Sequence, residues 1–146
     1  MIFSLITCCD KNYGIGKDNK LPWYYLKDIN FFKKQTLENT KNNKLNIVIM
    51  GNNTYKSIPK KFAPLKNRLN IVLTRDNVNN INKDNLIYFT NVNDILLFIH
   101  NNKEQYNDVY IIGGCKIYNL FLDLHIIQNI YLTIISDNDY QCDTFF

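Results

Sequence analysis

Glycine is scarce in this chain of 146 residues, and its five copies fall at expected strand ends or in the first long loop: Gly14, Gly16, Gly51, Gly113 and Gly114. Glycine tolerates positive φ angles and lets a ligand approach the backbone closely. Gly113-Gly114 follows an apolar run and opens a helical stretch, so its amides favour an anion such as a pyrophosphate. A tight turn is the simpler interpretation, because the third glycine of GxGxxG is missing.

Arginine is rarer still, since only Arg68 and Arg75 stand against 15 lysines. A guanidinium offers a rigid fork for a carboxylate or phosphate, which lysine does not. Thr74-Arg75 follows an expected strand and places a hydroxyl and a cation together, as a phosphate clamp would. From the residues alone, bidentate anion binding and a surface ion pair remain equally good interpretations.

Asp28 is the carboxylate most suited to chemistry, because it lies early in an expected helix, beside Ile29 and one turn from Phe32. Burial beside apolar side chains raises the pKa of a carboxyl group unless a ligand cation pairs with it. The alternative is an acid that merely favours the helix N-terminus. His100 and His125 fit helix ends or loops, so neither a histidine triad nor a metal site is expected.

Composition predicts one domain over residues 1–146, in a cytoplasmic protein that binds neither nucleic acid nor membranes. The apolar fraction of 46% is enough for a core, and no apolar run is long enough to span a bilayer. The net charge of +4 comes from scattered lysines, which favours a solvated surface. The four cysteines lack zinc-binding spacing and are interpreted as reduced, mostly buried thiols.

Strands and helices alternate along the sequence, which predicts an α/β fold with a mostly parallel central sheet and helices on both faces. Ligands of such sheets bind at the carboxyl ends of the strands. The expected strands are Ile2–Cys9, Leu45–Met50, Leu69–Leu73, Leu86–Phe89, Val109–Ile112 and Ile130–Ile135, the expected helices are Tyr24–Leu37, Thr54–Ile58, Val92–His100 and Ile117–Leu124, and the longer loops are Asn12–Pro22 and Asn77–Asn85.

Taken together, these segments resemble the dihydrofolate reductase family. The matching blocks keep the family's order and spacing from end to end: Ser4–Ile6, Gly14–Trp23, Leu26–Asp28, Phe32–Thr36, Ile49–Pro59, Pro64–Arg68, Leu73–Arg75, Ile111–Tyr118, Leu132-Thr133 and Asp143–Phe146. The resemblance implies that NADPH delivers a hydride to carbon 6 of 7,8-dihydrofolate while nitrogen 5 takes a proton, giving 5,6,7,8-tetrahydrofolate. The cofactor supplies the hydride chemistry, and the protein positions the rings and excludes water.

The resemblance also implies roles for individual residues. Asp28 would hold the pterin ring, backed by Thr133, and Arg68 would grip the glutamate carboxylate; Asn12–Trp23 would be a mobile lid over the nicotinamide. The implied catalytic residues are Asp28, Trp23, Leu21 and Thr133. The implied folate-binding residues are Ile6, Thr7, Cys8, Asp28, Ile29, Phe32, Ile58, Leu65, Arg68, Ile112, Tyr118 and Thr133. The implied cofactor-binding residues are Ile15, Gly16, Asn19, Gly51, Asn52, Asn53, Thr54, Leu73, Thr74, Arg75, Gly113, Gly114, Cys115, Lys116, Ile117 and Tyr118.

The chain departs from the family pattern at two places. A basic residue usually stands at Asn52 or Asn53 to help hold the cofactor's 2′-phosphate, so we expect a weakened preference for NADPH. Family members also continue past Asp143–Phe146 into a final β-hairpin, whereas this sequence stops at Phe146. We expect an exposed apolar edge on strand 130–135, covered by self-association or by a fused or associated partner such as thymidylate synthase.

Two other functions remain open at this stage. A reductase of another pterin or pyrimidine would share the fold, but Asp28 and Arg68 together argue for a substrate with a pterin and a glutamate tail. A catalytically impaired binding module would explain the missing hairpin, but the presence of Asp28, Trp23 and Thr133 argues against it.

Overall fold

The computed structural model describes residues 1–18, 21–38, 43–76, 83–135 and 140–146. Its strands are β1 (Phe3–Asp10), β2 (Gly14–Gly16), β3 (Leu45–Gly51), β4 (Arg68–Leu73), β5 (Leu86–Phe89), β6 (Tyr106–Gly113), β7 (Asn129–Ile135) and β8 (Thr144–Phe145). Its helices are α1 (Leu26–Leu37), α2 (Asn52–Ser57), α3 (Val92–Asn101) and α4 (Cys115–Asp123). Within these described ranges, no helix is both long and apolar enough to cross a bilayer.

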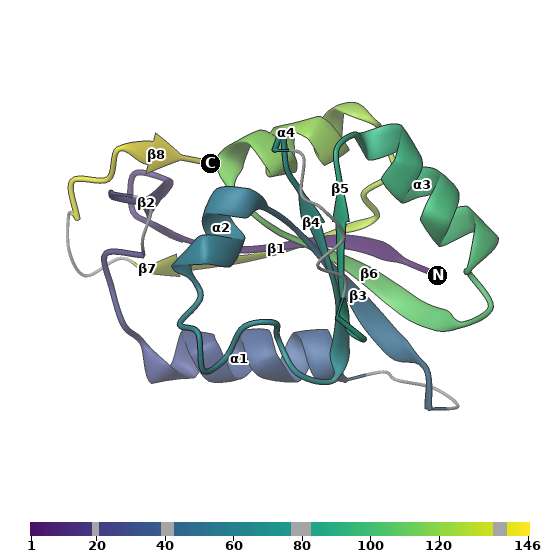
Figure 1. Cartoon of the computed structure of the whole chain (residues 1–146). Coiled ribbons are helices and arrows are strands. Elements are labelled where there is room, and N and C mark those ends of the chain that lie inside the picture. The colour runs from purple at the N-terminus through teal and green to yellow at the C-terminus, as the bar shows by residue number, and fades with distance from the viewer. Residues whose placement is uncertain (19–20, 39–42, 77–82, 136–139) are drawn as a thin grey trace.

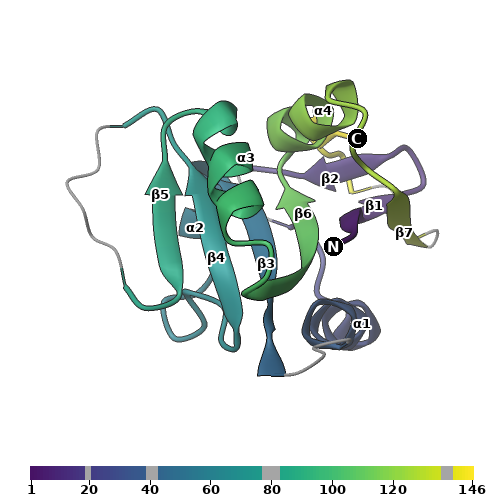
Figure 2. The ribbon, with the colours of Figure 1, turned by 90° about the vertical axis from the view of Figure 1, so that its right-hand side faces the viewer.

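Six strands form the central sheet in the order β5-β4-β3-β6-β1-β7. Every neighbouring pair in this sheet is parallel, as the alternation of strands and helices predicts. Helix α1 covers one face, and α3 and α4 cover the other (Figure 1, Figure 2). The expected α/β fold with helices on both faces is therefore confirmed.

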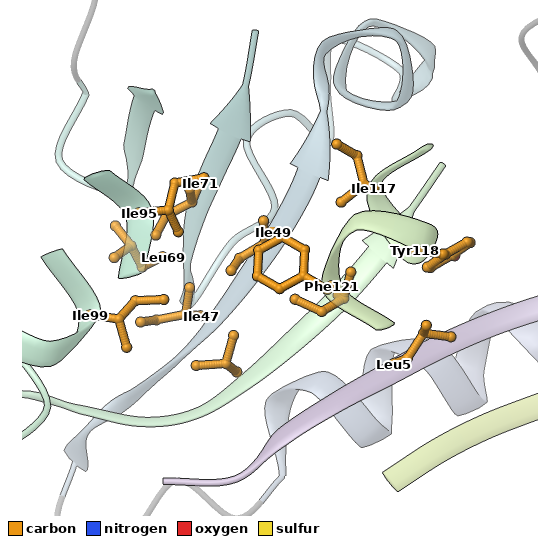
Figure 3. Packing of buried hydrophobic residues seen from close by; sticks show 12 residues of the cluster. Leu5, Ile47, Ile49, Leu69, Ile71, Ile95, Ile99, Ile117, Tyr118 and Phe121 are labelled. Atoms are coloured by element: carbon orange, nitrogen blue, oxygen red, sulfur yellow. The ribbon is translucent and has the colours of Figure 1, made fainter. Parts of the chain in front are cut away.

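The two faces of the sheet carry two separate cores. Alternation along β3 sends Ile47 and Ile49 toward α3 and α4, where they pack with Phe121 (Figure 3). Val48 and Met50 point the other way and pack with residues that include Phe32 of α1 and Tyr55 of α2. Because β3 and β6 are covered on both sides, they contain uninterrupted apolar stretches, 47–50 and 109–112, rather than an alternating pattern.

A second, two-stranded sheet joins β2 to β8 in antiparallel pairing. It lies beyond one end of the central sheet, next to α4 (Figure 1). The prediction of Asn12–Pro22 as pure loop is wrong at this point, because β2 forms within it. Two glycines and one isoleucine carry no strand periodicity, and their partner is far away in the sequence.

The other element boundaries differ by only a few residues from those expected. Helix α1 begins at Leu26 rather than Tyr24, and β6 begins at Tyr106 rather than Val109. Arg68 is the first residue of β4 and is not in the loop before it. Most of the expected loop Asn77–Asn85 lies outside the described residues.

Candidate active site

Asp28 lies in the first turn of α1, near the thiol of Cys8 on β1, with which it interacts electrostatically. Cys8 shares a face of β1 with Ile6, two residues earlier, which belongs to the core on the α1 side of the sheet. Burial raises the pKa of the Asp28 carboxyl group, and the interaction with Cys8 opposes that rise. A carboxylate is thus held half-buried where the first turn of a helix faces the end of β1.

Trp23 packs with Cys8 and Ile135 in a small third core. Its indole Nε1–H is buried and has no hydrogen-bond partner among the described residues. An edge contact with Tyr140 fixes the ring from the far side, with centroids 5.2 Å apart. An unmet buried donor beside an acid calls for an acceptor from outside the chain.

Arg68 stands near the other end of α1 and is 6% exposed. Its Nε donates to the Lys66 carbonyl oxygen and one terminal nitrogen donates to Thr36 Oγ1, both at 2.9 Å. A guanidinium has five N–H donors, so three are left after these two bonds. Burial lowers the pKa of Arg68 to about 10, which shows how poorly the charge is compensated.

Asp28 and the helical partner of Arg68 therefore lie near opposite ends of α1. Eight residues separate Asp28 from Thr36, the helical partner of Arg68, which corresponds to roughly 12 Å along the helix. Within the described part of the chain, the ion pair is Lys34 with Glu38 on the surface of α1. Neither Asp28 nor Arg68 is thus neutralised by a described side chain.

The carboxyl ends of the parallel strands gather a second group of predicted residues. Gly51 is the last residue of β3 and α2 follows it, Thr74 and Arg75 follow β4, and Gly113 is the last residue of β6, with Gly114 directly after it. This is the edge at which ligands of parallel sheets bind. The Thr74 side chain is buried and accepts a bond from the Asp76 amide at 3.1 Å, while Arg75 is exposed.

Gly113 and Gly114 bring the starts of two helices close together. Gly113 has a φ of +122°, and an added Cβ would lie 3.0 Å from the Tyr118 hydroxyl oxygen. The Cβ of a residue at 114 would lie 3.5 Å from Thr54 Oγ1 of α2. Gly114 caps α4 without a side-chain hydrogen bond, so the first amides of α4 lack an internal side-chain acceptor. This backbone suits an anion, as the glycine pair predicts.

Tyr118 of α4 links the residues at the carboxyl ends of the strands to β1. Its hydroxyl donates to the Ile6 carbonyl oxygen at 3.0 Å. Burial raises the pKa of this phenol strongly, so it stays neutral and acts as a structural clamp between α4 and β1.

The segment after β1 is anchored by Asp10, whose side chain is buried. One carboxylate oxygen accepts from the amides of Asn12 and Gly14, both at 2.8 Å, and the other contacts the Cys142 thiol at 3.6 Å. Burial would raise the pKa of Asp10, but these hydrogen bonds together lower it. An exposed carboxylate, that of Asp143, accepts from the Asp18 amide at 3.0 Å. Residues 12–18 are therefore held against the segment 140–146.

The structure places the remaining predicted residues as follows. Thr133 stands opposite Cys8 in the β1–β7 pairing, and Leu21 is 57% exposed. Phe32, Ile58, Leu65 and Ile112 pack against the core on the α1 side of the sheet, Ile29 is exposed on α1, Ile15, Leu73 and Ile117 belong to the opposite core, Gly16 is in β2, Asn52 and Asn53 open α2, and Cys115 and Lys116 open α4. Asn19 lies outside the described residues.

Three positioning contacts were not predicted from the sequence. They are Thr36 as the partner of Arg68, Asp10 as the anchor of the amides of Asn12 and Gly14, and the electrostatic interaction of Cys8 with Asp28. The sequence gives one partial signal, since a polar threonine interrupts the apolar pattern of α1 at a position that is fully buried.

Comparison with known proteins identifies the family of this chain. The family model described as "Dihydrofolate reductase" matches residues 2–146. The dihydrofolate reductase of Candida albicans is 39% identical over 90% of this chain and 68% of its own length, and that of Pneumocystis carinii is 34% identical over 98% and 72%.

Bifunctional dihydrofolate reductase-thymidylate synthase 2 of Arabidopsis thaliana is 37% identical over 98% of this chain. The chain spans 26% of that relative's length. With the α/β fold, the acid at one end of α1 and the buried arginine at the other, these matches show that the chain belongs to the dihydrofolate reductase family of oxidoreductases.

Proposed function

We propose that this chain catalyses the NADPH-dependent reduction of 7,8-dihydrofolate to 5,6,7,8-tetrahydrofolate. The observation that carries the proposal is the pair of uncompensated charges along α1. Asp28 needs a cationic or hydrogen-bond-donating partner, and Arg68 needs an anion about 12 Å away along the helix. Dihydrofolate carries a pterin with an amino group at one end and a glutamate at the other, with an apolar aminobenzoyl spacer between them.

The residues between the two charges suit that spacer. Phe32 of α1, Ile58 and Leu65 are partly buried against the core on the same side of the sheet. Apolar side chains flanked by a few oriented polar groups are the usual composition of a small-molecule site. We assign these three residues to the aminobenzoyl ring.

The assignment of the cofactor site rests on residues at the carboxyl ends of the parallel strands. The glycine backbone at 113–114 and the uncapped start of α4 suit a pyrophosphate, and Thr74 with Arg75 suits the 2′-phosphate of NADPH. When bound, this cofactor supplies the hydride. Because Asn52 and Asn53 add no cation, we expect the Michaelis constant for NADPH to be only moderately below that for NADH; equal values would contradict the assignment of Thr74 and Arg75.

The chain's own groups orient the pterin and govern its proton. The Asp28 carboxylate accepts bonds from the ring N–H and the amino group, and it favours a protonated substrate through charge. Trp23 Nε1–H provides a donor for the oxygen side of the pterin or for a water between them. The segment 12–18, anchored through Asp10, lies where it can exclude solvent from the reacting rings.

The test is turnover and ligand discrimination by the chain as it stands. Purified protein should oxidise NADPH only when dihydrofolate is present. Dihydrobiopterin, which has the pterin but lacks the glutamate, should give a much lower kcat/KM, because Arg68 then gains no partner. Equal kcat/KM values for the two substrates would favour a reductase of another pterin.

We also propose that residues 1–146 form one domain. In the functional protein, another polypeptide strand then covers the exposed edge of β7. β7 is the terminal strand of the sheet, and Ile130, Leu132 and Ile134 are 51%, 38% and 52% exposed. Such an edge favours pairing with another strand, supplied by a second copy or by a fused or associated chain such as a thymidylate synthase. Light scattering after size-exclusion chromatography tests self-pairing, and a stable monomer would contradict it. A cytoplasmic location stays a proposal that cell fractionation can test.

A further inference from the structure

Tyr140 connects Trp23 to the start of α1 through two contacts. Its ring forms an edge contact with the indole, with ring centroids 5.2 Å apart and an angle of 63° between the planes. Its hydroxyl shares a hydrogen bond of 2.6 Å with the hydroxyl of Tyr25, which lies 115 residues earlier in the chain. Tyr25 is the N-cap residue of α1, and its carbonyl oxygen accepts the amide of Ile29 at 3.0 Å. The ring of Tyr140 is therefore held by the helix while it packs against the indole.

The orientation of the Trp23 ring depends on side chains rather than on a regular backbone. Residues 21–25 belong to no helix or strand, so no hydrogen-bond ladder fixes this segment. Aromatic pairs prefer particular angles between their rings, and the bond between the two tyrosine hydroxyls is as short as such bonds normally are. Together these contacts define one direction for the indole.

That direction matters because the indole carries an unmet donor. Trp23 is 8% exposed, and its Nε1–H has no hydrogen-bond partner among the described residues. A buried N–H of this kind is satisfied by an acceptor from a ligand or a water. Such a donor contributes to binding and to reaction geometry only if the ring that carries it is held in place.

We propose that Tyr140 is a positioning residue for the reaction, acting through Trp23. Its bond to Tyr25 fixes its own ring, and the edge of that ring fixes the indole so that Nε1–H keeps its direction toward the pterin or its bound water. The inference rests on the proposed function, because it takes this N–H as a donor that faces the ligand.

A merely structural role for Tyr140 would act elsewhere in the molecule. Tyr140 begins the segment that also holds residues 12–18, where the Asp143 amide donates to the Gly16 carbonyl oxygen and the Asp143 carboxylate accepts from the Asp18 amide, both at 3.0 Å. Loosening of these contacts would disturb the proposed cofactor site. Binding of NADPH therefore separates a structural role from an effect on the indole.

Three substitutions isolate the two contacts. Tyr140→Phe keeps the ring and removes the hydroxyl bond, and Tyr25→Phe removes the same bond from the other side. Tyr140→Leu removes the aromatic contact as well. Tyr24→Phe is the matched control, because Tyr24 is 79% exposed and adjoins both Trp23 and Tyr25 in the sequence.

The first measurement is the mobility of Trp23 in the ligand-free chain. Trp23 is the single tryptophan of the sequence, so time-resolved fluorescence anisotropy reports this ring alone on the nanosecond timescale of side-chain motion. Tyr140→Phe and Tyr25→Phe should each increase the amplitude of fast indole motion, and Tyr140→Leu should increase it further. Tyr24→Phe should leave the decay unchanged.

The second measurement is turnover of dihydrofolate with NADPH. Tyr140→Phe and Tyr25→Phe should each lower kcat/KM for dihydrofolate about three- to tenfold, as expected for the loss of one hydrogen bond. The double variant should lose no more than either single one, because both remove the same bond. The dissociation constant for NADPH should stay unchanged. In a Trp23→Phe background, Tyr140→Phe should cause no further loss.

The inference would be overturned by an anisotropy decay that does not respond to Tyr140→Phe. An equal loss of kcat/KM in the Trp23→Phe background, or weaker NADPH binding in parallel with the loss, would also overturn it, since either would assign Tyr140 a structural role. Failure of the proposed function would appear differently, as an unmodified chain that does not turn over dihydrofolate while Tyr140→Phe still loosens the indole.

Discussion

Replacing Arg68 with methionine should stabilise the ligand-free protein while weakening its binding of dihydrofolate. Arg68 is 6% exposed and lacks a carboxylate partner within the described residues. Burial lowers its pKa to about 10 from the usual 12.5, which corresponds to a cost of roughly 3 kcal/mol in the free energy of unfolding. For a base, this cost is complete below the folded pKa and fades as the pH rises toward the unfolded one, so it applies fully at neutral pH.

The loss of two hydrogen bonds opposes this increase in the free energy of unfolding. The bonds of Arg68 to the Lys66 carbonyl and to Thr36 Oγ1 disappear in the variant, at roughly 1 kcal/mol each. Methionine fills the same space with a flexible apolar chain. The net expectation is an increase of about 1 kcal/mol in the free energy of unfolding, which corresponds to about 2–4 °C in Tm for a domain of this size.

Urea denaturation of the ligand-free variants checks the stability, and Arg68→Lys is the control, because it keeps a buried charge and should show no gain. Calorimetry checks the binding. The dissociation constant for dihydrofolate should rise about 100-fold in Arg68→Met, as expected for about 3 kcal/mol of charge-assisted hydrogen bonding, while that of 2,4-diaminopyrimidine stays unchanged. A variant less stable than the unmodified chain by more than about 1 kcal/mol, or one that loses both ligands equally, would refute this reasoning.

Three further predictions concern the loops around the site. Gly14→Ala should weaken the β2–β8 pairing and raise amide exchange in both strands, because an added Cβ would lie 2.5 Å from Cys142 Cβ and Sγ; unchanged exchange would contradict this crowding. Gly113→Ala should weaken NADPH binding and lower Tm, because the residue has a φ of +122° and its Cβ would press on the Tyr118 hydroxyl; a variant that binds NADPH normally would show that the strain is tolerated. Asp10→Asn should lower the free energy of unfolding at neutral pH by about 1–2 kcal/mol. Since the folded pKa of Asp10 lies below its usual 3.8, that difference should shrink as the pH falls below about 4, and a gap that persists into strong acid in urea titrations would argue against the carboxylate.

The central sheet was predictable because its strands are buried on both faces. Runs such as 47–50 and 109–112 are apolar without interruption, which is the pattern of parallel strands covered by helices. The small sheet was not predictable, because β2 contains only Gly14, Ile15 and Gly16 and pairs with residues at the far end of the chain. The carboxylate of Asp10 holds the nearby amides of Asn12 and Gly14 and contacts Cys142 at the far end of the chain, and no periodic pattern encodes these contacts.

The site shows the same division between local and long-range information. The rarity of arginine draws attention to Arg68, and the family resemblance assigns a role to Asp28. The bond from Arg68 to Thr36 and the interaction of Cys8 with Asp28 depend on how α1 lies against the sheet. Sequence therefore predicts which groups take part, while the fold decides which of them touch.

Turnover by the unmodified chain and by Asp28→Asn, measured as dihydrofolate-dependent loss of NADPH absorbance, tests the proposed function most directly. Asparagine keeps the size of the side chain but removes the charge that binds and helps to protonate the pterin. We expect turnover by the unmodified chain and a loss of about 100-fold or more in kcat/KM for the variant at neutral pH. Equal kcat/KM in the two proteins, or no turnover by folded unmodified protein, would contradict it.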